Sequence, residues 1–144
     1  MQDLPHHYRV SASAKTVDNV VLSSAGIPDL ESAGPAEFGG PGDRWSPETL
    51  LVAAVADCFI LSFRAVARAS HFEWEALTCE VNGTLDKIER ATQFTHFDIA
   101  ATLTVAPGTD VDKATKLLEK AEHICLISNS LKAESHFKAS IVVG

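Results

Sequence analysis

The most apolar stretch of the chain is predicted to form one long helix. Ser46 is a good helix N-cap, Pro47 suits the first helical position, and Glu48 lies in the first turn, where the helix dipole favours an acid. The segment Thr49–Ala69 contains no glycine or proline and is apolar on nearly every side at first. A helix that is apolar all round is normally buried on all sides. Because the chain is short, we expect a second subunit to supply part of the cover.

Alternating apolar and polar residues predict strands on both sides of this helix. A long loop rich in Gly, Pro, Ser and Ala is expected over residues 24–45. Asp110 is expected to cap a second, amphipathic helix, and a short helix is expected from Cys125 to Leu131. Strands and helices do not alternate regularly, which predicts an α+β fold rather than a doubly wound sheet. The expected strands lie at residues 7–13, 17–23, 75–86, 95–106 and 137–143.

The bulk properties narrow the class of protein. The chain has 144 residues, which fits a single domain over residues 1–144 with its own core. Its net charge of -7 argues against nucleic acid and anionic membranes as partners. The apolar run Leu50–Leu61 is interrupted by Asp57, and we expect it to be too short and too charged to span a bilayer. No secretory pattern opens the sequence, so a soluble, cytoplasmic protein is expected.

The candidate chemistry lies in three widely spaced cysteines, Cys58, Cys79 and Cys125. No CxxC pair occurs, so neither a structural zinc nor a disulfide framework is expected, and the six histidines show no metal-ligand spacing. In a reducing compartment such cysteines are either buried apolar residues or reactive thiols. Cys79 alternates with Leu77 and Val81 on a strand, which favours packing.

Cys58 and Cys125 leave both interpretations open. Cys58 fits core packing on the long helix, whereas Cys125 is expected at a helix start, where free amides would stabilise a thiolate. Glu48 lies ten residues before Cys58, roughly 15 Å along a straight helix. The two side chains can therefore interact only through a helix break or a third group. The preference of acidic residues for the first turn of a helix explains the position of Glu48 equally well.

Two segments of the chain resemble the OsmC/Ohr superfamily. Residues 46–59, SPETLLVAAVADCF, resemble the family's central helix, which opens with Asn or Ser, Pro and Glu and carries the reactive cysteine before a Phe. Residues 123–131, HICLISNSL, resemble its second cysteine element, usually Cys-Pro-Val-Ser-Asn. The loop Phe38-Gly39-Gly40 and the order of strands also agree, so the resemblance covers nearly the whole chain.

This resemblance implies an OsmC-like fold, in which long central helices are wrapped by antiparallel sheets in an intertwined homodimer. It also implies a thiol-dependent peroxidase of the oxidative stress response that reduces organic hydroperoxides to alcohols. Carried over by position, Cys58 is the peroxidatic thiol, Cys125 the resolving thiol and Glu48 a partner in the site. Cys79 matches no catalytic position. An external dithiol, for which a lipoyl-bearing protein is a candidate, would complete the cycle without a metal or another cofactor.

The chain departs from the family pattern in two places. The family's hydroperoxide reductases place an Arg in the turn after the first strand, where this chain has Lys15, and Arg44 is a second candidate for the supporting cation. Lysine lacks the planar fork that would hold a carboxylate and a thiolate together. Leu126 replaces the usual Pro. These departures keep an alternative open, an OsmC-like small-molecule-binding or stress-related protein without efficient peroxidase activity.

The expected substrate pocket is apolar. Leu51, Val55 and Phe59 neighbour Cys58 on the predicted helix and are expected to line it, which would suit an organic hydroperoxide better than hydrogen peroxide.

Overall fold

The computed structural model describes all 144 residues, which divide into two compact units, Met1–Leu50 and Leu51–Gly144. The boundary between the two units falls in the first turns of helix α1, Pro47–Ala69. A division into compact units does not test the prediction of one domain over residues 1–144, which stays a prediction. The two units differ in a way that matters for function, because only the second has a hydrophobic core of its own.

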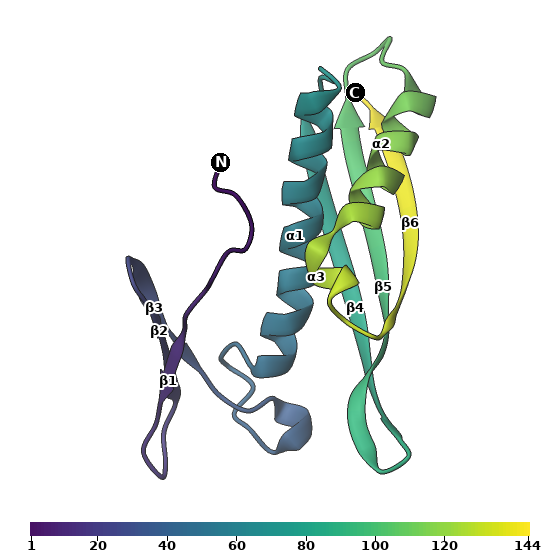
Figure 1. Ribbon diagram of the computed structural model, residues 1–144. Helices are drawn as coiled ribbons and strands as arrows, with labels where there is room; N and C mark the ends of the chain where they lie inside the picture. The colour runs from purple at the N-terminus through teal and green to yellow at the C-terminus, as the bar shows by residue number, and fades with distance from the viewer. The chain divides into compact units, whose positions relative to one another are not determined.

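The first unit contains a small antiparallel sheet in the order β1-β2-β3 (Figure 1). Its strands are β1 Ser11–Ser13, β2 Val20–Ser24 and β3 Ile27–Ser32, followed by a 3-10 turn, η1, at Ala36–Phe38. No hydrophobic side chain of this unit is buried; its two buried residues are Ser32 and Ser46. A three-stranded sheet needs a packed apolar face for independent stability, so this unit is incomplete by itself.

Strand β3 corrects the prediction of an unbroken loop over residues 24–45. A two-residue turn at Ala25-Gly26, with Gly26 at a φ of 81°, reverses the chain between β2 and β3. Leu22 and Leu30 then face each other across the hairpin. The many Gly, Pro and Ser residues of the segment obscured this short signal. The first strand was also overestimated, since only residues 11–13 of the predicted 7–13 pair with β2.

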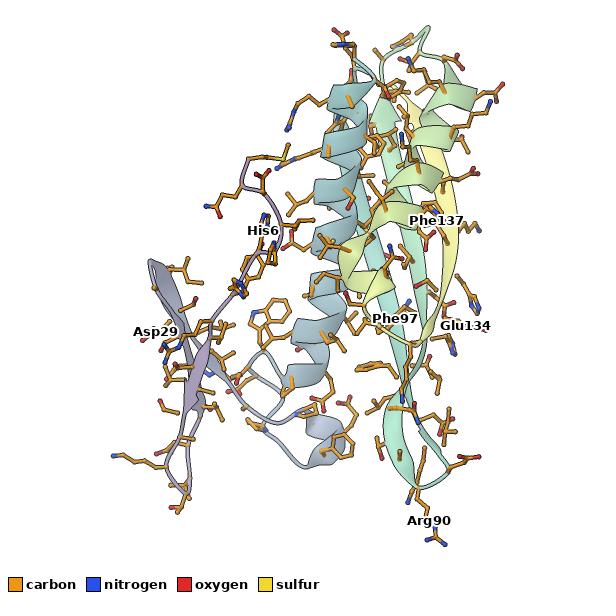
Figure 2. All side chains as sticks on the ribbon, viewed as in Figure 1. His6, Asp29, Arg90, Phe97, Glu134 and Phe137 are labelled. Atoms are coloured by element: carbon orange, nitrogen blue, oxygen red, sulfur yellow. The ribbon has the colours of Figure 1, made fainter.

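The second unit is built on a three-stranded sheet in the order β4-β5-β6. Strand β4, Ala76–Ile88, and strand β5, Ala91–Val105, form a long antiparallel hairpin, and β6, Glu134–Val143, runs parallel to β5. Figure 2 shows Arg90 at the tip of this hairpin and Glu134 at the start of β6. The expectation of antiparallel sheets holds for the other strand pairs but was wrong for β6, because β5 and β6 are joined by a helical crossover, which returns the chain in the same direction.

The crossover consists of α2, Val111–Ile124, and α3, Leu126–Asn129. Asp110 caps α2 as predicted, since its Oδ1 accepts the Lys113 N–H at 3.0 Å. In Figure 1, α1 and α2 lie along the same sheet. Their buried stripes meet alternate residues of β5 in one core. Its fully buried members are Phe59, Phe63, Val66, Ala67, Ala101, Leu103, Val105, Ala114, Leu117, Leu118 and Ala121.

The start of α1 is set by reciprocal hydrogen bonds, as the sequence predicted. The Thr49 N–H donates to Ser46 Oγ at 3.1 Å, and the Ser46 N–H donates to Thr49 Oγ1 at 2.8 Å. The pair forms a capping box that satisfies two amides left free at the helix start. The long helix predicted from its N-cap is therefore confirmed over 23 residues.

Helix α1 has more apolar surface than the rest of the chain covers. Judged by length and composition alone, it is long and apolar enough to cross a membrane, a test that the core helix of a soluble protein passes as well. The helix continues to Ala69, well past that run. Only 28% of its most apolar 18-residue stretch is buried within the chain. The remaining apolar surface is the face that carries Cys58.

Candidate active site

Cys58 lies on the face of α1 that turns away from the sheet. Val55 and Phe59, on the sheet-facing side, are 0% and 1% exposed, whereas Cys58 is half-buried. The Cys58 Sγ lies 4.0 Å from the hydroxyl of Ser62, one helical turn further on. Residues four apart share one helix face, so this contact follows directly from the helix. The thiol is thus reachable from outside the chain and has a polar group beside it.

Cys125 lies at the junction of α2 and α3, where it is only 1% exposed. The Ser128 hydroxyl donates a hydrogen bond to its sulfur at 3.3 Å, and the Ser128 backbone amide donates to it as well. The prediction that Cys125 opens a short helix is confirmed, since it is the N-cap of α3. Ser128, three residues after Cys125, is a site neighbour that helical spacing alone could have identified.

The Cys58 and Cys125 side chains lie close enough for Cys58 to affect the ionisation of Cys125. Two sulfurs that are 67 residues apart in the sequence (125 − 58) therefore meet in the fold. Burial raises the pKa of the Cys125 thiol, and the two Ser128 hydrogen bonds oppose this rise. The neighbouring Cys58 side chain and its charge raise the pKa of Cys125 further. Ser128 at the start of α3 therefore stabilises a Cys125 thiolate as expected, but desolvation outweighs this effect and the pKa is raised.

An open, mostly apolar cavity of about 520 Å³ lies beside Cys58. This volume falls within the range of roughly 300–1,000 Å³ typical of small-molecule sites. Its walls come from the exposed face of α1 and from the junction that carries Cys125. The lining residues are Ala54, Asp57, Cys58, Leu61, Ser62, Ala65, Ile124, Leu126 and Ile127.

The residues expected to line the pocket are placed differently. Val55 and Phe59 are completely covered by the protein core and do not line this cavity. Leu51 packs against the cluster formed by Val55, Phe97 and Ile99. The sequence prediction failed because it assigned to the pocket the residues that lie near Cys58 along the chain. In a helix, successive side chains point to different sides, so these neighbours do not share the face of Cys58.

Cys79 lies on β4 and faces the core. It packs against both hydrophobic clusters of the second unit. Burial, and secondarily the charge of Cys125, raise the pKa of Cys79 from 9.0 to about 11. A thiol with so high a pKa carries little thiolate at neutral pH and reacts slowly. The packing interpretation therefore suits Cys79 better than a chemical role.

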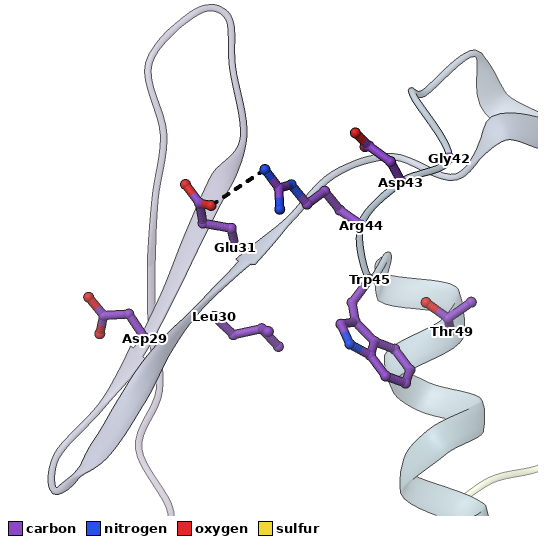
Figure 3. A pocket seen from close by; sticks show the side chains of 8 residues that line it. All are labelled: Asp29, Leu30, Glu31, Gly42, Asp43, Arg44, Trp45 and Thr49. Carbon is purple, nitrogen blue, oxygen red and sulfur yellow. Dashed lines mark ion pairs between the residues drawn. The ribbon is translucent and has the colours of Figure 1, made fainter.

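Glu48 and the two candidate cations belong to the first unit. The Glu48 Oε1 is buried and has no hydrogen-bond partner. Arg44 instead pairs with Glu31, with 3.8 Å between its Nη2 and the Glu31 Oε2 (Figure 3). Lys15 is exposed on the loop between β1 and β2. Neither cation forms an ion pair with Glu48. Burying a carboxylate oxygen without a hydrogen-bond donor costs free energy. The Glu48 Oε1 therefore requires a donor, and none of the side chains of this chain supplies one.

Arg44 also lines a second depression, of about 570 Å³, which lies entirely in the first unit. Figure 3 shows the Arg44–Glu31 ion pair across one side of it, with Trp45 and Thr49 on the other. Both partners of the pair are about half exposed, so water screens it and it contributes little stability.

Comparison with known proteins identifies the family of this chain. Residues 40–140 match the family model described as OsmC-like protein. The chain belongs to the OsmC-like family. The OsmC-like match covers Arg44, Glu48, Cys58 and Cys125, whereas Lys15 precedes it.

Relatives of this OsmC-like chain include proteins with and without an assigned role. An uncharacterised protein of Bacillus subtilis, YmaD, is 32% identical over 117 residues, which cover 76% of this chain and 77% of the relative. An organic hydroperoxide resistance protein of Xanthomonas axonopodis is 33% identical over 114 residues, covering 77% of each. The solved structure of an OsmC-like protein of unknown function from Vibrio cholerae has a TM-score of 0.86 at 17% identity, covering 94% and 99% of the two chains. The OsmC-like fold predicted from the sequence is confirmed.

Proposed function

We propose that this protein is a thiol-dependent peroxidase that reduces organic hydroperoxides to alcohols through Cys58 and Cys125. The observation that carries the proposal is the proximity of the two thiols, one of which opens onto an apolar cavity while the other is buried. The family's organic hydroperoxide resistance proteins point to the same chemistry.

The proposed reaction begins at Cys58. Its thiolate attacks the outer peroxide oxygen, the O–O bond breaks, and the leaving alkoxide takes up a proton to become the alcohol. Cys58 is thereby oxidised to a sulfenic acid. The Cys125 sulfur then attacks the Cys58 sulfur, the S–O bond breaks, and water leaves as the disulfide forms.

The environments of the two thiols support this division of roles. Cys58 lines the open cavity, so a peroxide can reach it, whereas Cys125 is buried and its raised pKa keeps it protonated. The thiolate is the nucleophilic form, so the first attack belongs to Cys58.

An external dithiol must then return the pair to the reduced state. Two electrons pass to the disulfide, and the donor itself becomes a disulfide. A lipoyl-bearing protein is our candidate, since a dihydrolipoyl group is a compact dithiol on an extended arm. This cycle requires a reducing compartment, for which we propose the cytoplasm.

We propose further that the protein acts as a homodimer. The first unit has no buried hydrophobic side chain, and α1 exposes Leu61 at 53% on the face opposite its core stripe. A second copy would cover these surfaces. We retain Glu48 as a site partner that orients a cation, either Lys15 or Arg44. The unpartnered buried oxygen of Glu48 supports that role, since it requires a donor.

The experiment that tests the peroxidase is consumption of cumene hydroperoxide with dithiothreitol or dihydrolipoamide. Wild type should turn over, and Cys58→Ser should lose at least about a thousandfold of the rate, because it lacks the nucleophile. Cys125→Ser should complete the first oxidation without forming the intramolecular disulfide. Cys79→Ser, the matched control, should keep wild-type activity. Undiminished peroxide consumption by Cys58→Ser would refute the assignment.

A non-catalytic binding protein is the alternative. It is favoured by one observation, that Arg44 pairs with Glu31 and no cation pairs with Glu48. Mass spectrometry of the intact protein after one equivalent of peroxide separates the two functions. Rapid loss of two hydrogens that maps to Cys58 and Cys125 supports the enzyme. Slow oxidation spread over all three cysteines supports the binding protein.

A further inference from the structure

The hydroxyl of Ser128 contacts the sulfur of Cys125, and the peroxidase cycle proposed above gives that contact no role. We propose that Ser128 is a positioning residue that speeds the second step, in which Cys125 attacks oxidised Cys58, and thereby protects Cys58 from further oxidation. The inference rests on the proposed function and adds to it a residue that controls how fast the sulfenic acid is resolved.

The contact is built by the backbone of one short segment. Cys125 is the N-cap of α3 and Ser128 lies three residues later, so one helical turn brings the hydroxyl to the sulfur. The Ser128 hydroxyl donates to the Cys125 Sγ at 3.3 Å. Because Cys125 is only 1% exposed within the chain, a second copy can add little to the direct contacts of this sulfur. The contact therefore does not depend on what covers α1.

Cys125 needs a donor because its surroundings oppose ionisation. Burial is the largest influence on the pKa of this thiol and raises it, whereas the hydroxyl and the backbone amide of Ser128 lower it. The titratable groups that interact with Cys125 are Cys58 on α1 and Cys79 on β4. Neither is a cation, so the opposition to desolvation comes from Ser128 alone.

The second step moves one electron pair and one proton. The electron pair of the Cys125 sulfur forms the S–S bond, and the S–O bond of the Cys58 sulfenic acid breaks. The departing hydroxide takes up the proton that Cys125 loses, which yields water. Negative charge develops on the Cys125 sulfur as its proton leaves, and the Ser128 hydroxyl donates to the sulfur at that moment.

Slow resolution would expose Cys58 to a competing reaction. While the sulfenic acid persists, a second hydroperoxide can transfer an oxygen atom to it, which gives a sulfinic acid and a second molecule of alcohol. A dithiol does not reverse this oxidation. The ratio of sulfinic acid to disulfide therefore reports how fast Cys125 attacks.

The size of the effect follows from the strength of one hydrogen bond to a charged sulfur. Its loss in Ser128→Ala should lower the thiolate fraction of Cys125 by about tenfold or more. A thiol of higher pKa is the better nucleophile once ionised, which recovers about half of the loss on a logarithmic scale. We therefore expect Ser128→Ala to slow the second step by about three- to tenfold at neutral pH. The deficit should shrink as the pH rises, because Cys125 then ionises without help.

The test follows a single turnover of the reduced protein with one equivalent of cumene hydroperoxide and no reductant. Loss of peroxide reports the first step, and intact mass after rapid quenching reports conversion of the sulfenic acid to the disulfide. Ser128→Ala should consume peroxide at the wild-type rate and form the disulfide about three- to tenfold more slowly. With excess peroxide it should accumulate more Cys58 sulfinic acid than wild type.

Ser130→Ala is the matched control. It removes another hydroxyl from the same segment, one that donates to the Leu126 carbonyl at 2.7 Å. Ser130→Ala should therefore form the disulfide at the wild-type rate at every pH. The two variants together separate the hydrogen bond to the sulfur from the general stability of the segment.

The outcomes also separate this inference from the proposed function. If wild type forms the Cys58–Cys125 disulfide and Ser128→Ala forms it equally fast at neutral pH, the peroxidase stands and the role of Ser128 is refuted. A slowing by the same factor at every pH, or an equal slowing in Ser130→Ala, would mean that the segment has merely changed shape, which also refutes the role. If peroxide produces no Cys58–Cys125 disulfide in wild type, both proposals fail together.

Discussion

The two faces of helix α1 are both apolar, but they differ in what covers them. One face, with Val55, Phe59 and Phe63, is fully buried against the sheet and α2. The other, with Cys58 and Leu61, remains open to a cavity. The helix thus joins a face that stabilises the fold to a face that carries the chemistry, and substitutions on the two faces should have different consequences.

The largest expected difference is in stability. Phe63 is fully buried and meets Trp74 edge to face, with 5.3 Å between ring centroids. Phe63→Ala should lower the free energy of unfolding by about 3–5 kcal/mol at every protein concentration, because a large cavity remains. Leu61→Ala, the matched change on the open face, should destabilise mainly at concentrations that support the proposed dimer. Urea unfolding over a hundredfold range of concentration checks both. Equal, concentration-independent losses would contradict the comparison.

A smaller effect is expected at Gly83 of β4, which packs closely against Val52 of α1. A Cβ on Gly83 would lie 2.9 Å from Val52 Cγ2 and 3.0 Å from the rings of Phe94 and Phe97. Gly83→Ala should therefore lower the free energy of unfolding by about 1–3 kcal/mol, since the core must shift to admit the methyl group. At Gly34 the nearest atom to an added Cβ is 3.9 Å away, so Gly34→Ala is the control and should change stability little. Thermal unfolding of both variants measures the difference. A neutral Gly83→Ala would mean that the closely packed face is looser than described.

The smallest effect concerns pH and the buried side of the cysteine cluster. Because the pKa of Cys79 is raised from 9.0 to about 11 in the folded protein, its contribution to stability is complete below pH 9 and is lost as the pH rises through 11. After allowance for solvent screening, this contribution is about 1 kcal/mol. The unfolding free energy of wild type should thus fall more steeply between pH 9 and 11 than that of Cys79→Ala, measured in a reducing agent. Parallel curves would show that Cys79 titrates normally.

Much of the fold was predictable from local patterns. The helix starts at Ser46 and Asp110 follow from capping residues whose hydrogen bonds are local. The buried stripe of α2 follows from its helical period. Strand β3 was missed, because a short hairpin within a Gly- and Pro-rich segment has little local pattern. The parallel pairing of β5 and β6 was also missed, since strand direction depends on the crossover and not on the strands themselves.

The candidate site was predictable only in part. The motifs around Cys58 and Cys125 identified the two thiols, and Glu48 lies in the first turn of α1 as expected. The lining of the cavity was not predicted, because it combines one face of α1 with residues near Cys125 that are distant in sequence. Lys15 and Arg44 remain candidates for the supporting cation.

The sequence by itself determined that a long apolar helix carries one cysteine and that a second cysteine opens a short helix, because capping and periodicity are local properties of the chain. Only the tertiary structure decided that these two sulfurs meet, that Val55 and Phe59 are covered while Asp57 lines the cavity, and that desolvation outweighs the hydrogen bonds to Cys125. Burial and electrostatics depend on which segments pack together, and that packing brings together residues from distant parts of the sequence.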